Sequence, residues 1–143
     1  MADEITVRSS LTIRYSNQYY QSQPGQFTAD ATGVRGPSPG VVSASLTGTD
    51  VSFAALSVPT WCVFTNLDST NYVDVGAYEP STGVFYPLLE LGPGEQYVVK
   101  LSRNLGEQWS GSVTGTGTDA TDNTIRVRAN TAACDVKVEA FEA

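Results

Sequence analysis

The feature that most constrains the fold is a two-residue alternation of apolar and polar side chains over residues 5–15. Only Ser9 breaks the pattern. The apolar residues on the odd positions are Ile5, Val7, Leu11, Ile13 and Tyr15. Because successive side chains of a β-strand point to opposite faces, this pattern predicts one half-buried strand.

Short apolar segments bounded by turn-forming residues continue along the chain. The expected strands cover residues 41–46, 51–56, 61–65, 72–78, 84–91, 97–101, 125–128 and 134–140. The segment 47–50 between the first two predicts a hairpin, and Pro87 predicts an edge strand or a bulge. No window of a dozen residues has a 3.6-residue period. The sequence therefore predicts an all-β fold, an antiparallel β-sandwich or a jelly-roll-like barrel.

The length of 143 residues suits a single domain. We expect the β-sandwich over residues 41–143, preceded by an N-terminal strand and extended arm at 1–40. Two stretches, 16–40 and 102–123, have few apolar residues and exceed the usual length of a loop. Two interpretations stay open: flexible surface loops, or segments that become ordered against a neighbouring subunit or a larger assembly.

Charge and composition argue against several functions. The net charge of −7 argues against binding to nucleic acid, because an acidic protein repels the phosphate groups. The chain has no histidine, which removes Ser-His-Asp and Cys-His catalysis and imidazole metal sites. No apolar run is long enough to span a bilayer, and the acidic N-terminus is unlike a secretory signal. We therefore expect synthesis in a cytoplasm, with no nucleic-acid or membrane partner.

The remaining candidates for chemistry are weak, and we expect no catalytic site, no metal site and no cofactor. The carboxylates near turns are Asp68, Asp74, Glu90 and Glu95, and one sequence does not show that any two converge. Lys100 and Lys137 lack the signature of a serine–lysine dyad, and residues 119–123 lack the spacing and glycine of a calcium loop. We expect Cys62 and Cys134 to be buried and reduced.

Several short pieces follow one another in a characteristic order: FTNLDSTNYVDVG at residues 64–76, FYPL at 85–88, LGPGE at 91–95 and RANTAA at 128–133. In this order they resemble the sequences of a family of small structural proteins of tailed bacteriophages. The short piece DATG at 30–33 is also similar, whereas the Gly/Thr-rich segment 111–123 is longer than the family pattern.

This resemblance implies a virion structural protein, and it does not separate a head decoration protein from a neck or tail component. Our prediction is a non-enzymatic capsid decoration, or cement, protein on the outer capsid surface that stabilises the head. We expect it to bind the major capsid protein and itself, as a homotrimer whose N-terminal segment reaches across neighbouring subunits, because residues 1–40 lead from a strand into a proline-containing segment too extended to bury itself. The expected contact residues are Tyr19, Tyr20, Phe27, Val34 and Trp109. Two alternatives remain, a neck or tail component of the phage and a carbohydrate-binding module.

Overall fold

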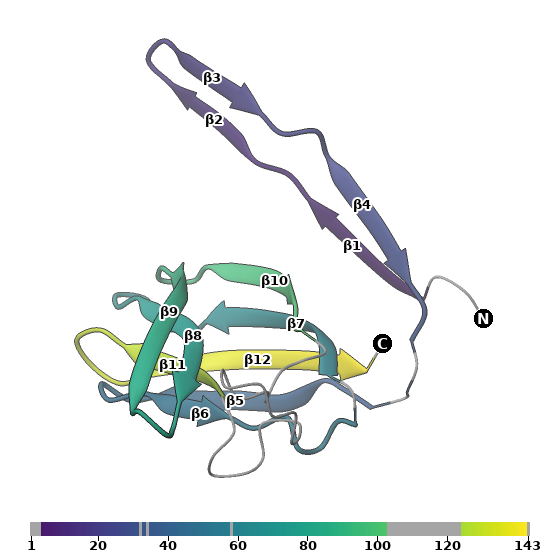
Figure 1. Cartoon of the computed structure of the whole chain (residues 1–143). Helices are drawn as coiled ribbons and strands as arrows, with labels where there is room; N and C mark the ends of the chain where they lie inside the picture. Colours follow the sequence, from purple (N-terminus) through teal and green to yellow (C-terminus); the bar gives the residue numbers. More distant parts are fainter. Residues whose placement is uncertain (1–3, 32, 34, 58, 103–123, 143) are drawn as a thin grey trace. The chain divides into compact units, whose positions relative to one another are not determined.

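The computed structural model describes residues 4–31, 33, 35–57, 59–102 and 124–142, and it divides the chain into two compact units. One unit comprises residues 1–32 and the other comprises residues 33–142. Strands are the only regular secondary structure among the described residues (Figure 1). The predicted all-β class is therefore confirmed.

The larger unit is an antiparallel β-sandwich of two four-stranded sheets. One sheet has the order β10-β7-β12-β5 and the other has the order β6-β11-β8-β9. Their strands are β5 (Ser38–Ala44), β6 (Thr49–Val51), β7 (Pro59–Asn66), β8 (Val73–Glu79), β9 (Val84–Leu91), β10 (Gln96–Lys100), β11 (Thr124–Ala129) and β12 (Cys134–Glu142). Every pairing between neighbouring strands is antiparallel.

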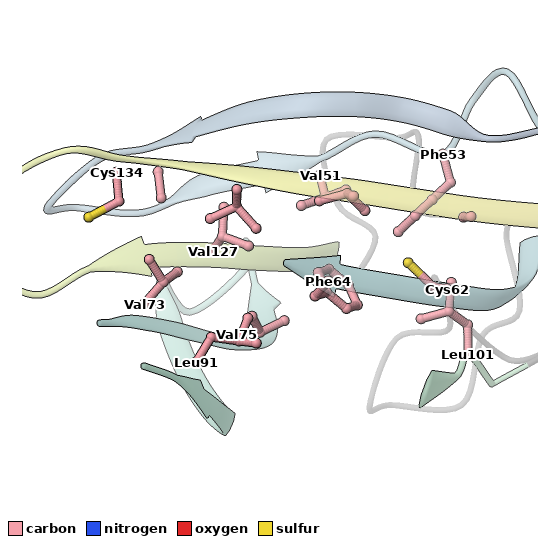
Figure 2. Packing of buried hydrophobic residues seen from close by; sticks show 14 of the residues in the cluster. Val51, Phe53, Cys62, Phe64, Val73, Val75, Leu91, Leu101, Val127 and Cys134 are labelled. Carbon is pink, nitrogen blue, oxygen red and sulfur yellow. The ribbon is translucent and has the colours of Figure 1, made fainter. Parts of the chain in front are cut away.

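The core lies between these sheets because the apolar residues of each strand occupy alternate positions. Along β12, Val136, Val138 and Ala140 are fully buried, while the intervening Lys137 and Glu139 are partly exposed. The facing sheet contributes Val73, Val75, Leu91 and Val127 to the same cluster (Figure 2). The alternation that predicted the strand at 134–140 therefore also gives its buried face.

The hairpin expected at residues 41–56 is wrong. Strands β5 and β6 belong to different sheets, so the turn between them carries the chain from one layer of the sandwich to the other. The hydroxyl of Ser45 donates to the Gly48 carbonyl at 3.0 Å, and Thr49 Oγ1 donates to the Ser43 carbonyl at 2.8 Å. These side-chain hydroxyls thus satisfy backbone carbonyls of the turn, in place of the backbone hydrogen bonds of a hairpin.

The second half of that expected hairpin is also shorter than predicted. Strand β6 ends at Val51, and the next apolar residues, Phe53 and Leu56, are buried from a turn. The Leu56 amide donates to the Phe53 carbonyl at 2.9 Å, which closes this turn. A short apolar run does not by itself distinguish a strand from a turn whose side chains reach the core.

The prediction for Pro87 is confirmed in both respects. Strand β9 is an edge strand, and its register against β8 shifts between Val75 and Gly76. Val75 pairs with Leu89 and Gly76 pairs with Pro87, which leaves Leu88 as the extra residue of a bulge. The bulge suits proline because it has no N–H to donate to a ladder.

The smaller unit is a two-stranded ribbon, which differs from the expected single strand and extended arm. It is built from β1 (Ile5–Ser9), β2 (Thr12–Tyr15), β3 (Gln18–Gln21) and β4 (Gly25–Ala29). The chain reverses at Ser16 and Asn17, so that β2 pairs with β3 and β1 pairs with β4. Residues 16–40, expected to lack regular structure, therefore contain two strands of the ribbon and the start of β5.

The bulge predicts an unusual sensitivity at Gly76. A Cβ atom there would overlap the backbone carbonyl oxygen of Tyr86, which is held by the bulged strand. We expect Gly76→Ala to lower the free energy of unfolding by about 2–3 kcal/mol, because backbone on both sides has to move. Urea unfolding of the variant measures this loss.

The matched control is Gly94→Ala. Gly94 has a φ of 73° and no atom within 4 Å of the added methyl group, so this change brings backbone strain without a clash. We expect a loss of about 1 kcal/mol. A loss at Gly76 no larger than the loss at Gly94 would contradict the close approach described for the bulge.

Candidate functional site

The ribbon has two chemically different faces, because directly opposed residues of an antiparallel pair share a face. In the β1–β4 half, Ile5 pairs with Ala29 and Val7 pairs with Phe27. In the β2–β3 half, Ile13 pairs with Tyr20. The apolar face of the ribbon is defined here by Ile5, Val7, Ile13, Tyr15, Tyr20, Phe27 and Ala29.

The opposite, polar face is held together by cross-strand contacts between side chains. Arg8 pairs with Gln26, and its Nε donates to the Gln26 side-chain oxygen at 3.0 Å. Arg14 pairs with Tyr19, and its guanidinium carbon lies 5.4 Å from the centre of the tyrosine ring. Both arginines of the ribbon strands therefore lie on the polar face.

The apolar face is exposed in its β2–β3 half and at Phe27, whereas Ile5 and Val7 are partly buried, so the half-buried strand expected at residues 5–15 holds only at its start. Tyr15 is 78% exposed, Phe27 is 59% exposed and Tyr20 is 50% exposed. Leu11, between the two halves of the ribbon, is 55% exposed. The physical reason is that alternation predicts which side chains share a face, whereas burial needs a second layer against that face.

Three of the residues expected to make contacts lie on the ribbon, on both of its faces. Tyr20 and Phe27 belong to the apolar face, whereas Tyr19 belongs to the polar face, where its hydroxyl donates to the Gln21 side-chain oxygen at 2.9 Å. Val34 and Trp109 lie outside the described residues. Ile13 and Tyr15, which share an exposed face with Tyr20, were not among the expected contact residues, although the alternation over residues 5–15 already placed them on one face.

The outer faces of the sandwich are more polar than the apolar face of the ribbon. On the β6-β11-β8-β9 sheet, Arg126 contacts Asp50 at 2.6 Å and Arg128 contacts Asp74 at 3.0 Å. On the other sheet, Lys137 contacts Glu139 at 2.9 Å. These partly exposed pairs contribute little stability, but they show that water is the expected neighbour of both surfaces.

A second candidate site is an apolar opening of about 330 Å³ in the sandwich. Its lining comes from both sheets and includes Phe64, Val75, Leu89 and Ile125. Lys100, at its rim, has its ammonium nitrogen 5.4 Å from the centre of the Trp61 ring. A ligand site normally adds polar groups that fix orientation, and Lys100 and Ser102 are the polar residues of this lining. The opening therefore specifies no ligand.

The segment that carries the family resemblance forms a loop with a structural role. Asn66 is fully buried at the end of β7, where its side-chain nitrogen donates to the carbonyls of Asn71, Leu91 and Gly92 at 2.8–3.1 Å. Its side-chain oxygen accepts from the Asp68 amide at 2.9 Å. One amide side chain thus satisfies backbone groups of two loops at once.

Asp68 closes the same loop from its exposed side. Its carboxylate accepts hydrogen bonds from the amides of Asn71 at 2.6 Å and Thr70 at 2.7 Å. These bonds, first that of Asn71 and then that of Thr70, lower the pKa of Asp68 because they favour the charged form. The carboxylate is therefore a turn-stabilising group.

The other carboxylates singled out by the sequence do not form an acid–base pair with it. The Gly92 amide donates to Glu95 Oε2 at 2.7 Å, which caps the turn before β10. Asp74 and Glu90 are directly opposed on β8 and β9, and Asp74 is the partner of Arg128. Asp68, Asp74 and Glu95 therefore each have a structural partner.

The second buried polar side chain of the sandwich is Glu142, at the end of β12. Its carboxylate accepts a hydrogen bond from the Ser57 amide at 2.6 Å. It also packs so closely on Gly33 that a Cβ there would overlap the carboxylate. This glutamate thus fastens the first residues of the sandwich unit to its last strand.

Both cysteines are buried and free of disulfide bonds, as predicted. Burial raises the pKa of the Cys62 thiol to about 12, which keeps it protonated and unreactive at neutral pH. Burial, and after it the charge of Asp68, also raises the pKa of Cys134. Each thiol therefore acts as a small apolar core residue.

The described residues contain no cluster of three or more potential metal ligands. The weak calcium-site candidate at residues 119–123 lies outside them, as does the Gly/Thr-rich segment 111–123. None of the described residues belongs to a helix long and apolar enough to cross a membrane. Comparisons of the chain with protein-family models, with curated proteins and with solved structures found no match.

The hydrogen bonds to Asp68 predict a pH dependence of stability. Because folding lowers the pKa of this carboxyl group, its contribution is fully present above the unfolded pKa of about 4 and is lost as the pH falls through the lower folded value. We expect Asp68→Asn to be less stable than wild type at neutral pH, with a difference that shrinks below about pH 4.

Urea unfolding at neutral pH and at about pH 3 measures the effect. The control is Asp135→Asn, which removes a carboxylate from an exposed position on β12. We expect the control to stay close to wild type at neutral pH, since no side-chain bond of Asp135 holds a turn. A difference at Asp68 that persists undiminished in acid would rule out the charged form as the stabilising species.

Proposed function

We propose that this chain is a bacteriophage virion structural protein, a capsid decoration protein that binds the outer capsid surface and stabilises the head. The observation that carries the proposal is the ribbon: a unit of 32 residues that exposes aromatic side chains and has no second layer of its own. The resemblance of several sequence pieces to tailed-phage structural proteins supports the same function.

The ribbon favours an assembly role because an isolated two-stranded hairpin is marginally stable in water. Contiguous exposed apolar surface on a soluble protein usually marks an interaction site. Burial of that surface against a partner would offset the entropy lost when the ribbon becomes ordered. A protein that must remain on a particle gains contact area from such an arm without enlarging its core.

The sandwich supports the proposal in a different way. Its side-chain chemistry is used for ion pairs, turn caps and buried thiols, as seen at Arg128, Asp68 and Cys62. These groups stabilise the fold of the sandwich, which is a compact unit distinct from the ribbon. We therefore place the particle contacts on residues 1–32 and propose a non-enzymatic role.

Truncation tests the proposal. We expect a chain of residues 33–143 to lose binding to the phage heads that normally carry this protein, prepared from particles that lack it. The truncated chain should keep the thermal unfolding transition of the sandwich, because the core cluster lies entirely within that unit. Cosedimentation with heads and calorimetry measure the two properties.

The outcome decides between the proposed function and its alternatives. Truncated protein that still decorates and stabilises heads at wild-type occupancy would show that the ribbon does not carry the contacts. Immunolabelling of the neck or tail instead of the head shell would support a neck or tail component. Binding of the isolated full-length chain to a glycan array at micromolar affinity would support a carbohydrate-binding module.

A further inference from the structure

The apolar face of the ribbon has the properties of a surface that binds the same surface of a second copy of the chain. In a contact between identical faces, a charge near the two-fold axis meets the same charge of the other copy, and a charge away from the axis needs an opposite charge on the same face. The simplest self-complementary face is therefore one free of charge. Ile13, Tyr15 and Tyr20 in one half of the ribbon, and Val7 and Phe27 in the other, meet this condition.

The charges of the ribbon strands lie on the other face. Residues 5–29 contain two arginines and no acidic residue, and both arginines belong to the polar face. Two ribbons could therefore meet through their apolar faces while Arg8 and Arg14 of each copy stay in water. The reverse arrangement, polar face against polar face, would bring four arginines together and is disfavoured.

The outer faces of the sandwich also expose apolar residues, such as Val41 and Val98, but there they lie beside charged side chains: Val41 is directly opposed to Lys137. The outer face of the β6-β11-β8-β9 sheet carries the pairs of Arg126 with Asp50 and Arg128 with Asp74. The outer face of the other sheet carries Lys137 and Glu139. Covering either face with an apolar ribbon would remove water from these ions, at a cost that the ribbon has no groups to offset.

The area of the apolar face is sufficient for a specific contact between two copies. Tyr15, Phe27 and Tyr20 are 78%, 59% and 50% exposed, so these rings alone leave roughly 300–450 Å² uncovered on each ribbon. Two such faces in contact, with Leu11 and Ile13 included, would bury about 1,000 Å², the lower bound for a specific interface. The tyrosine hydroxyls would lie at its rim, where they can reach water.

We propose that the apolar face of the ribbon binds the same face of a second copy of this chain. Each ribbon supplies the second layer that the other lacks, in the aligned face-to-face packing of two antiparallel sheets. Ordering of the ribbon is then coupled to self-association. The polar faces, with Arg8, Arg14 and Tyr19, remain free on the outside of the pair.

This self-association does not depend on the proposed function, and its test contains no phage particle. Sedimentation equilibrium of the full chain, from low to high micromolar concentration, should show oligomers whose fraction increases with concentration. The double variant Ile13→Lys with Tyr20→Lys places two charges on directly opposed positions of the apolar face. We expect it to weaken association by about 100-fold or more.

The matched control is Thr12→Lys with Gln21→Lys, an opposed pair one step along the same strands that lies on the polar face. It adds the same charge to the same part of the ribbon, and we expect association within a few-fold of wild type. Hydrogen exchange of the β2 and β3 amides should slow with rising concentration in wild type and in this control, and not in the apolar-face variant.

A further pair of variants separates loss of contact from loss of ribbon structure. Ile13→Glu with Tyr20→Glu should also be monomeric by itself. Mixed with the lysine variant, it should form mixed oligomers, because opposite charges then meet across the two faces. A ribbon that had merely unfolded would not be rescued by mixing.

The results divide cleanly. A wild-type dimer that is lost in the lysine variant, kept in the control and restored in the mixture supports the proposal. A wild-type chain that stays monomeric at high micromolar concentration overturns it, as does an oligomer that survives the lysine variant or truncation to residues 33–143. A full-length chain that self-associates but does not bind phage heads would contradict the proposed function alone.

Discussion

A sheet that alternates apolar and polar residues needs a second layer against its apolar face, and this requirement organises the whole chain. The sandwich meets it internally: Val136 and Val138 of one sheet and Val73 and Val127 of the other are all fully buried in one cluster. The ribbon follows the same alternation with two strands and a single layer. Its large apolar residues from Leu11 to Phe27 are therefore exposed although their pattern resembles that of a core strand.

The two layers of the sandwich are joined at one end by a buried amide. Asn66 lies at the end of β7, and its side chain donates to the carbonyls of Leu91 and Gly92, where β9 of the other sheet ends. Asp68 and Glu95 cap the turns on either side of this junction. Residues 64–76 and 91–95, two of the pieces on which the expected family resemblance rests, build this junction, so a likeness in this region bears on the fold before it bears on a partner.

The division into a self-sufficient body and an incomplete ribbon gives the proposals a common physical basis. The sandwich contains its own core, so its folding does not require a partner. The ribbon exposes an apolar face, and in our proposal a second copy would cover that face without burying a charge. In the proposed function this arrangement leaves the arginine-bearing face of each ribbon for the particle, so that self-association and attachment use different sides of one small element.

The strands with regular alternation or dense apolar character were predictable from the sequence, as were the bulge at Pro87 and the buried, reduced thiols of Cys62 and Cys134. These properties depend on side-chain period, proline chemistry and residue polarity, which are local. The pairing of the strands does not depend on local sequence alone. The expected hairpin at residues 41–56 is wrong because the turn after Ala44 leads into the other sheet. Residues 16–40 contain strands that the sequence did not predict, because β3 pairs with β2 and β4 pairs with β1.

The sequence by itself determined the all-β class, the faces of most strands and the absence of histidine chemistry. Only the tertiary structure decided which faces are covered. Ile13 and Val136 occupy equivalent places in alternating segments, yet one is exposed and the other is fully buried. The reason is that alternation is a property of a single strand, whereas burial depends on a second layer supplied by residues distant in the chain, or by another molecule.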